Sequence, residues 1–469
     1  MSAASPDTGT SPLEMALRIW RAGVDAVRGD ALVETAVVVE DGSLWFDDVE
    51  VPLKSFRRLI VVGAGKAGAG MARGFENALG EKLLAEKQVD GWVNVPAPCV
   101  EKLSRIRLFA ARPAGVNEPT EEGVEGSRQI EQLVRSCKSD DLCVCLISGG
   151  GSALLPAPIE GVSLAQKRAL TKHLSGAGAD IAALNLVRRQ ISRLKGGGLA
   201  RACNAGRLVT LIISDVMGDP LEAIASGPTV PAQPDPGGAL AVLERFGAIH
   251  AGVAPEIVAV LRKQLDEAKS RGRKPDVAPV RAKLDTVVIG NVVSAVDAAG
   301  REAERLGLHF AMDAATTLEG AAEEVGRRHA DLALSMRGGT GPDCLITGGE
   351  PTVELPPAHL RGKGGRNQQA ALAALIAVRD ADAGAAAAGR GIAFVSGGTD
   401  GEDGPTEAAG AFFDERILAR ARTLSQPPEL YLERCDAFTF FEQIGGLLVT
   451  GPTHTNVCDL RVLVVNPRG

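Results

Sequence analysis

Six short turns in this chain combine glycines with polar or charged side chains, and each follows a run of aliphatic residues. The turns are residues 63–68, 148–152, 214–219, 290–291, 347–350 and 396–403. Glycine lets backbone N–H groups approach phosphate oxygens, and the N-terminus of a following helix adds partial positive charge. Carboxylates are the ligands that Mg²⁺ prefers. Together the turns predict a site for nucleotide phosphates and a magnesium ion.

The glycine, hydroxyl and amide residues of these turns are our candidates for binding nucleotide phosphates. They are Gly63, Gly65, Ser148, Gly149, Gly150, Gly151, Ser152, Asn291, Gly397 and Gly398. The candidate magnesium ligands are the carboxylates of Asp215, Glu350, Asp400 and Asp403. A carboxylate in such a turn can equally cap the next helix, and that alternative stays open for each of them.

Lys66 lies inside a pattern, Gly63-x-Gly65-x-x-Gly68, that matches the dinucleotide-binding fingerprint. That fingerprint needs an acidic residue about 20 residues further on, at the end of the next strand, to bind the ribose. The next expected strand, residues 92–95, is instead followed by Pro96. A lysine in this turn suits a group that reaches a transferring phosphoryl. A turn that serves only close packing of a strand and a helix is the alternative.

Arg366 lies in a second basic and glycine-rich turn, residues 362–367, which opens an expected helix. A guanidinium has the fork geometry for a carboxylate or a phosphate. The alternative is a solvated basic loop. The segment from Arg188 to Lys195, with the three glycines that follow it, allows the same two interpretations.

The elements that must position these residues follow from the apolar pattern. Continuous aliphatic runs, typical of strands buried on both faces, occupy residues 59–63, 142–148, 208–214, 287–290, 344–347 and 392–396. Helical patterns occupy residues 163–173, 180–193, 237–246, 292–306 and 366–378. Near the N-terminus, Ser11 to Glu14 form a capping box, and residues 36–46 are typical of a hairpin around Asp41-Gly42. The alternation predicts a doubly wound α/β fold, in which ligands bind beyond the carboxyl ends of the strands.

Composition excludes several classes of function. The net charge is −7 and aromatic residues make up 3%, which argues against a nucleic-acid partner. The sequence has no apolar run of about 18 residues and no signal-peptide pattern, so we expect no membrane partner. The eight cysteines include no Cys-x-x-Cys pair and the six histidines are scattered, so we expect a reducing cytoplasm and no zinc site. A homodimer is left open.

A proline-rich segment near residue 228, followed by a polar stretch at 266–283, predicts a division into two α/β halves. We expect the domains to span residues 1–245 and 246–469.

With these motifs in place, the chain resembles the glycerate 2-kinase family, whose members are often named hydroxypyruvate reductase. The resemblance runs from Gly63 to about Val465. It rests on Gly63-Ala-Gly-Lys66-Ala, Ile147-Ser-Gly-Gly-Gly-Ser-Ala-Leu154, Lys195-Gly-Gly-Gly-Leu199, Ser214-Asp215-Val, Gly348-Gly-Glu350-Pro-Thr352, Gly362-Lys-Gly-Gly-Arg366-Asn367-Gln and Ser396-Gly-Gly-Thr-Asp400-Gly. The chain departs from the family at His454, where glycine is usual.

The resemblance implies two α/β domains with the active site in the cleft between them. The first would hold a Rossmann-like doubly wound parallel sheet, and the second, smaller domain a mixed sheet. It also implies ATP-dependent phosphorylation of D-glycerate to 2-phosphoglycerate with Mg²⁺. Lys66 and Arg366 would be the catalytic cations, and the carboxylates of Asp215, Glu350 and Asp400 would line the site. Our own hypothesis for the mechanism is that either Asp215 or Asp400 accepts the proton of the 2-hydroxyl group.

Two other functions remain as alternatives. An NAD(P)H-dependent hydroxypyruvate reductase is supported by the glycine fingerprint alone, and the missing ribose acid counts against it. A catalytically silent sensor of nucleotides or sugar phosphates would bind ligand without releasing ADP.

Overall fold

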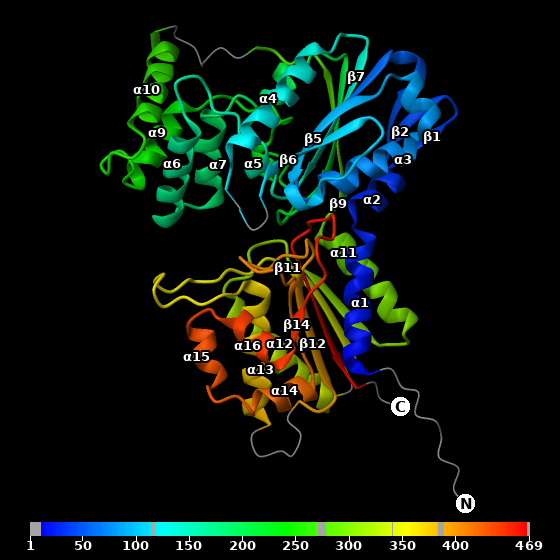
Figure 1. The fold of residues 1–469 in the computed structure, drawn as a ribbon, viewed down its shortest axis with the longest axis vertical. Helices are drawn as coiled ribbons and strands as arrows, with labels where there is room; N and C mark the ends of the chain where they lie inside the picture. The colour runs from blue at the N-terminus through cyan, green and yellow to red at the C-terminus, as the bar shows by residue number, and fades with distance from the viewer. Residues whose placement is uncertain are drawn as a thin grey trace, which may run out of the picture. The chain divides into compact units, whose positions relative to one another are not determined.

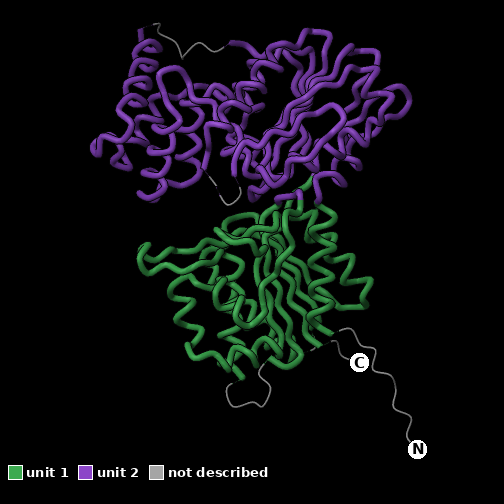
Figure 2. Tube along the Cα trace, viewed as in Figure 1, with its two compact units in different colours: residues 1–27, 290–453, 457–469 green, residues 28–289, 454–456 purple. Residues whose placement is uncertain are grey.

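The structure is a computed structural model that describes residues 11–113, 116, 118–270, 278–339, 341–382 and 389–466. The chain divides into two compact units, which Figure 2 colours separately. Unit 1 consists of residues 1–27, 290–453 and 457–469, and unit 2 of residues 28–289 and 454–456. The boundary expected at residues 245–246 lies within unit 2, between helices α9 (Pro236–Arg245) and α10 (Pro255–Ser270).

Unit 2 is built around a six-stranded sheet with the order β6-β5-β4-β7-β8-β9 (Figure 1). Its strands are β4 (Arg58–Ala64), β5 (Asp90–Pro96), β6 (Ile106–Arg112), β7 (Asp141–Ser148), β8 (Arg207–Ile213) and β9 (Lys283–Gly290). The pairs from β6 to β8 are all parallel. Counted from β4, the order is 3-2-1-4-5-6, which is the doubly wound order of dinucleotide-binding folds. The expected Rossmann-like sheet is therefore confirmed.

Helices cover both faces of this sheet. A Cβ atom on Gly68, at the start of α3 (Gly68–Glu86), would lie 2.9 Å from Val93 on β5. A Cβ atom on Gly126, in α4 (Glu121–Ser136), would lie 2.2 Å from the side chain of Asn94, which follows Val93 on β5. Because neighbouring residues of a strand point to opposite faces, α3 and α4 lie on opposite sides of the sheet.

The remaining elements of unit 2 form a small sheet and a separate helical cluster. A three-stranded antiparallel sheet contains β1 (Val37–Glu40), β2 (Ser43–Phe46) and β3 (Val49–Pro52), so the expected hairpin is confirmed. Four helices, α6 (Leu164–Gly176), α7 (Ile181–Gln190), α9 and α10, contribute to a second apolar core. The short helices are α2 (Gly29–Ala36), α5 (Gly151–Leu154) and α8 (Gly198–Ala202).

Unit 1 contains a mixed six-stranded sheet with the order β10-β11-β15-β12-β13-β14. Its strands are β10 (Phe310–Ala314), β11 (Cys344–Gly349), β12 (Ile392–Gly398), β13 (Gly410–Phe413), β14 (Leu447–Leu448) and β15 (Asp459–Val465). The central strand β15 runs antiparallel to both β11 and β12. The start of β15 therefore lies beside the carboxyl ends of those two strands, where Asp459 pairs with Gly349 and with Gly398. The expected smaller domain with a mixed sheet is confirmed.

The helices of unit 1 pack on this sheet and include the first helix of the chain. They are α1 (Pro12–Ala26), α11 (Val292–Arg305), α12 (Ala322–Gly338), α13 (Arg366–Ala381), α14 (Glu415–Ala421), α15 (Pro428–Glu433) and α16 (Ala437–Ile444). The capping box predicted at Ser11 and Glu14 is present at the start of α1. The buried Trp20 of α1 donates a hydrogen bond to the carbonyl oxygen of Leu460 on β15, at 3.0 Å. These contacts explain why the N-terminal helix belongs to the unit formed by the C-terminal half.

No helix in the described part of the chain combines the length and the apolar character that a membrane crossing needs. All eight cysteines lie in the described part, where they are buried and form no disulfide.

Candidate active site

In unit 2, the turns after β4 and β7 meet at the point where the strand order of the sheet reverses. The backbone N–H of Lys66 donates to the carbonyl oxygen of Gly149 at 2.9 Å, and the N–H of Ala67 donates to Ser148 Oγ at 3.0 Å. The side chain of Lys66 runs beside Gly150, where a Cβ atom would lie 3.1 Å from Lys66 Cγ. Ligands of doubly wound sheets bind at this reversal point.

Gly150 and Gly149 have separate structural reasons to be glycine. Gly150 has a φ of 76°, in the left-handed region, and directly precedes the short helix α5. A Cβ atom on Gly149 would lie 2.1 Å from Asn456 Nδ2 and 2.2 Å from Asp215 Oδ2. Asn456 donates to Asp215 through the same two atoms at 3.1 Å. The turn after β7 thus lies against a carboxylate–amide pair on one side and against Lys66 on another.

The other glycines of these two turns pack closely against neighbouring segments of unit 2. A Cβ atom on Gly63 would lie 2.4 Å from the carbonyl oxygen of Leu146 in the neighbouring strand. The N–H of Gly65 donates to the carbonyl oxygen of Asn94 at 3.2 Å. These contacts favour the packing alternative for Gly63 and Gly65. A Cβ atom on Gly151 would lie 2.9 Å from that of Ala225, and Ser152 Oγ bonds to Ser226 Oγ at 2.9 Å.

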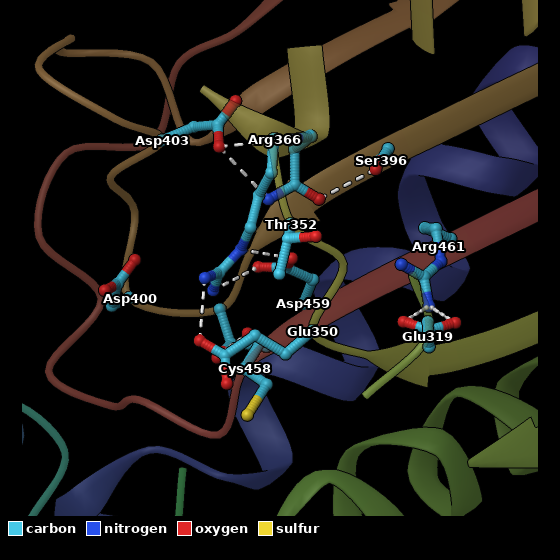
Figure 3. A network of polar contacts seen from close by, with 12 residues as sticks. Glu319, Glu350, Thr352, Arg366, Ser396, Asp400, Asp403, Cys458, Asp459 and Arg461 are labelled. Atoms are coloured by element: carbon cyan, nitrogen blue, oxygen red, sulfur yellow. Dashed lines mark hydrogen bonds and ion pairs between the residues drawn. The ribbon is translucent and has the colours of Figure 1, made fainter. Parts of the chain in front are cut away.

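In unit 1, Arg366 opens helix α13 and points toward two carboxylates (Figure 3). Its Nε and Nη2 atoms donate to the two oxygens of Asp459 at 2.7 and 3.1 Å, and its Nη1 atom donates to Glu350 Oε1 at 2.7 Å. The side chain of Asp459 is 1% exposed, whereas those of Arg366 and Glu350 are each 34% exposed. The guanidinium is held in a fixed orientation and remains partly open to solvent.

Burial and charge act on the ionisation of this group. Burial lowers the pKa of Arg366, but the charges of Asp459 and Glu350 outweigh it and raise that pKa well above its usual value. Burial raises the pKa of Glu350, and the charge of Arg366 opposes this change. Arg366 is therefore a permanent cation.

Asp400 and Asp403 follow β12 but face different surroundings (Figure 3). Asp400 accepts a hydrogen bond from the N–H of Glu402 at 3.0 Å and keeps intermediate exposure. Asp403 is buried, and its two oxygens accept the N–H groups of Asn367 and Gln368 at 3.1 and 2.8 Å, so it caps helix α13. Burial, followed by the charge of Asp459, raises the pKa of Asp403 to about 7.

Three other candidates are engaged in the fold of unit 1. Asn291 is the N-cap of α11, and its side-chain oxygen accepts the N–H of Ser294 at 3.2 Å. The N–H of Gly398 donates to the carbonyl oxygen of Ala409 at 2.7 Å, which argues against its use for a phosphate. A Cβ atom on Gly397 would lie 2.8 Å from the ring of Trp20.

Asp459 belongs to the candidate site in unit 1 but is not among the residues predicted from the sequence. The predicted residues follow strands, whereas Asp459 is the first residue of a strand. Only the antiparallel direction of β15 brings it to the same edge as Glu350 and Asp400.

Three buried cysteines, Cys137, Cys143 and Cys203, were also not grouped from sequence, although their sulfur atoms lie within 4.8 Å of one another.

His454 lies in unit 2 and has a φ of 58°, in the left-handed region that favours glycine. Its carbonyl oxygen accepts the N–H of Gly29 at 3.0 Å. His454 is therefore a residue of the loop between β14 and β15.

Comparison with known proteins gives consistent matches over nearly the whole chain. Residues 15–262 match the family model described as a domain of unknown function, DUF4147, and residues 343–459 match the MOFRL family. The glycerate kinase of Homo sapiens is 36% identical over 97% of this chain and 93% of its own length. A protein of Agrobacterium vitis named putative hydroxypyruvate reductase is 37% identical over 88% of this chain and 89% of its own. The crystal structure of a Thermotoga maritima glycerate kinase superposes with a TM-score of 0.74 at 31% identity, covering 96% of this chain and 99% of that one.

Proposed function

This chain belongs to the glycerate kinase family, and we propose that it is an ATP-dependent kinase that converts D-glycerate to 2-phosphoglycerate. The observation that carries the proposal is the meeting of two turns at the reversal point of the parallel sheet in unit 2. There the side chain of Lys66 lies against Gly150, on the turn that leads into α5. The first N–H groups of a helix have no partner within it, so they are available to phosphate oxygens.

We assign the phosphates of ATP to the backbone of residues 149–152. Lys66 supplies a positive charge to the transferring phosphoryl group. Phosphoryl transfer requires little covalent chemistry from the protein, because positioning and charge stabilisation provide most of the rate acceleration. A lysine on a turn that is fixed by backbone hydrogen bonds is well suited to that task.

We assign the binding of the phosphoryl acceptor, D-glycerate, to Arg366. Its hydrogen bonds to Asp459 and Glu350 use three of the five N–H groups of a guanidinium, which leaves donors for a carboxylate or phosphoryl oxygen. Asp459 acts as a positioning residue, because it fixes the plane of the guanidinium through two bonds. Asp215 and Asp400 are the candidates for accepting the proton of the 2-hydroxyl group.

Carboxylate oxygens are the right donor type for Mg²⁺, but those of Glu350, Asp400 and Asp403 do not gather into a three-ligand cage. Among the described residues, the one group of three or more potential ligand atoms within 4.8 Å is the cysteine group of unit 2. Mg²⁺ usually keeps several waters and takes one or two carboxylates together with substrate phosphates, and the residues present fit that mode. Asp215, Glu350 or Asp400 would hold the ion. The two oxygens of Asp403 instead accept N–H groups in the first turn of α13. When bound, Mg²⁺ neutralises charge on the phosphate oxygens.

The proposal is tested by phosphorus NMR of the product formed from ATP, Mg²⁺ and D-glycerate. We expect the resonance of 2-phosphoglycerate. Phosphate on the 3-hydroxyl group would overturn the regiochemistry, and release of no ADP would overturn the kinase assignment. In a parallel reaction, hydroxypyruvate and NADH should show no loss of nicotinamide absorbance. Oxidation of NADH would favour the reductase alternative.

A further inference from the structure

Three basic side chains of unit 2 lie near one another, beside the turn at residues 148–152. Lys167 lies on α6, Arg188 lies on α7, and Lys195 lies between α7 and α8. Lys167 and Lys195 are 6% and 3% exposed, whereas Arg188 keeps intermediate exposure. The cluster belongs to the Arg188–Lys195 segment, for which the sequence left two interpretations open.

The described neighbours of these cations provide no compensating negative charge. Lys195 Nζ donates to the carbonyl oxygens of Ser152 and Ala225 and to Ser152 Oγ, each at 3.2 Å. Lys167 Nζ is buried and has no hydrogen-bond partner in the described part of the chain. Arg188 Nη1 lies 3.4 Å from the amide oxygen of Asn185. All these partners are neutral oxygens.

Acids on nearby elements are already paired with other cations. Glu131 accepts hydrogen bonds from Arg135 and Arg193, and Glu118 pairs with Arg168. The charges that act on Lys167 are those of Arg188 and Arg193, and the charges that act on Lys195 are those of Lys167 and Arg188. Lys167 and Lys195 therefore each lie close to two further basic side chains.

A buried charge without a partner is costly, and the ionisation of the cluster reflects that cost. Burial, with repulsion from Arg188 and Arg193, lowers the pKa of Lys167 to about 7. Burial also lowers the pKa of Lys195 well below its usual value, and burial lowers that of Arg188. A bound anion would supply the charge that the protein lacks.

The backbone beside Lys195 is held in an unusual conformation. Ala225 and Ser226 are consecutive non-glycine residues with φ of 50° and 63°, in the left-handed region. Ser226 Oγ donates to the side-chain oxygen of Asn185 at 2.9 Å and also bonds to Ser152 Oγ. These bonds tie three segments together around the ammonium group of Lys195. Strain of this kind persists where the surrounding structure fixes it, typically at ligand sites.

We propose that Lys167, Arg188 and Lys195 form a binding site for an oxyanion, a phosphate or a carboxylate group. The inference rests on the proposed function in one respect: Lys195 bonds to Ser152, the last residue of the turn assigned to the phosphates of ATP. The oxyanion can therefore come from the nucleotide, from free phosphate or from the acceptor.

The first experiment measures thermal unfolding of the full-length protein with and without inorganic phosphate. The test variant is Lys167→Met, and the control is Lys172→Met, which removes an exposed lysine from the same helix. We expect phosphate to raise the Tm of the wild type and of Lys172→Met. Lys167→Met should have a higher Tm than the wild type in phosphate-free buffer, and phosphate should raise it much less. A lower Tm together with an unchanged response to phosphate would overturn the proposal.

A second measurement, calorimetric titration with inorganic phosphate, uses a readout that a merely structural lysine would not change. At pH 8 the binding of phosphate should take up protons, because it favours the charged form of Lys167. Proton uptake is obtained by repeating the titration in buffers of different ionisation enthalpy. It should be smaller in Lys167→Met, where only Lys195 can still take up a proton, and kept in Lys172→Met. Equal uptake in both variants would contradict the proposal.

If Lys167→Met does not fold, Arg188→Gln, at a less buried position, should weaken phosphate binding at least tenfold.

Separate titrations of the wild type and Arg188→Gln with inorganic phosphate, ADP and D-glycerate distinguish the sources of the oxyanion. The ligand whose Kd rises at least tenfold in Arg188→Gln identifies the natural occupant, and three unchanged values would overturn the proposal. Weakened phosphate binding in a protein without kinase activity would overturn the proposed function alone. Normal kinase activity with unchanged phosphate binding would overturn the oxyanion site alone.

Discussion

Arg366 and Arg461 in unit 1 each lie against carboxylates, whereas Lys167 and Lys195 in unit 2 face neutral oxygens and other cations. Arg461 is fully buried, and its Nη2 atom contacts both oxygens of Glu319 at 2.8 Å (Figure 3). Arg366 has Asp459 and Glu350. The cluster in unit 2 has no such acid among its described neighbours.

The difference separates cations whose charge is compensated by acids of the fold from basic side chains that have no acid beside them in the described part of the chain. Removing one partner of a buried ion pair leaves the other charge uncompensated, so the acids of unit 1 should be needed for stability. Lys167 and Lys195 have no acidic partner in the described part of the chain. Replacing one of them with an apolar residue should therefore stabilise the protein and weaken binding of the oxyanion. The predictions below test this contrast by changing one charge at a time.

The largest effect is expected at Lys66. Lys66→Ala should lower kcat by about 10³-fold or more, because a cation on the transferring phosphoryl contributes on that scale. The fold should survive, since the contact of Lys66 with Gly149 is made by its backbone. Steady-state kinetics with ATP and D-glycerate, together with circular dichroism, measure both parts. Lys82→Ala, at an exposed lysine of α3, is the control and should keep full activity. Near-normal turnover by Lys66→Ala would remove Lys66 from the catalytic assignment.

In unit 1, Glu319→Gln should destabilise the protein by about 3–5 kcal/mol, because it leaves Arg461 buried without a compensating charge. Urea unfolding monitored by fluorescence measures the change. Glu324→Gln, at an exposed residue of α12, should change stability by less than about 0.5 kcal/mol. If Glu319→Gln lowers the free energy of unfolding by less than about 1 kcal/mol, the pairing of Arg461 with an acid does not matter for stability, and the contrast with the lysines of unit 2 fails.

The sequence predicted the parallel sheet of unit 2 well, because its strands carry a strong local signal. The runs at residues 59–63, 142–148 and 208–214 correspond to β4, β7 and β8, and their polar ends lie where the argument from parallel strands expects them. Burial on both faces requires continuous aliphatic residues, so the pattern is visible without tertiary information.

The mixed sheet of unit 1 was harder to predict, because strand direction is a long-range property. The strand β15 was not among the predicted runs, although residues 459–465 are buried along their whole length. Without its antiparallel direction, Asp459 could not be assigned to the edge that carries Glu350 and Asp400. The cation cluster of unit 2 was left ambiguous for a related reason. Whether Lys195 is solvated or buried depends on Ser152 and Ala225, which are distant in the chain.

The pH dependence of stability should distinguish the unpaired lysine of unit 2 from an ordinary one. The pKa of Lys167 is about 7 in the folded protein and near 10.5 when unfolded, so between these values the unfolded chain binds more protons. Stability from this group therefore rises with pH, by roughly 2 kcal/mol between pH 7.5 and 9. Without phosphate, Lys167→Met should be more stable than the wild type at pH 7.5, and the difference should shrink by that amount at pH 9. Lys172→Met should show no such trend, and a pH-independent difference for Lys167→Met would contradict the unpaired state.

The smallest effect is expected at Asp459, where the contrast concerns orientation rather than charge alone. Asp459→Asn should lower kcat about tenfold, because an amide cannot accept both N–H groups of Arg366 and the guanidinium then turns more freely about its bond to Glu350. The KM for ATP should stay close to that of the wild type, since the phosphates are assigned to unit 2. Asp382→Asn is a matched control: it removes the carboxylate that accepts from both Nη atoms of Arg337 at 2.8 and 2.7 Å, and it should leave kcat unchanged. A drop in kcat for both variants would point to a general loss of stability in unit 1, whereas unchanged kcat in Asp459→Asn would mean that Glu350 alone orients Arg366.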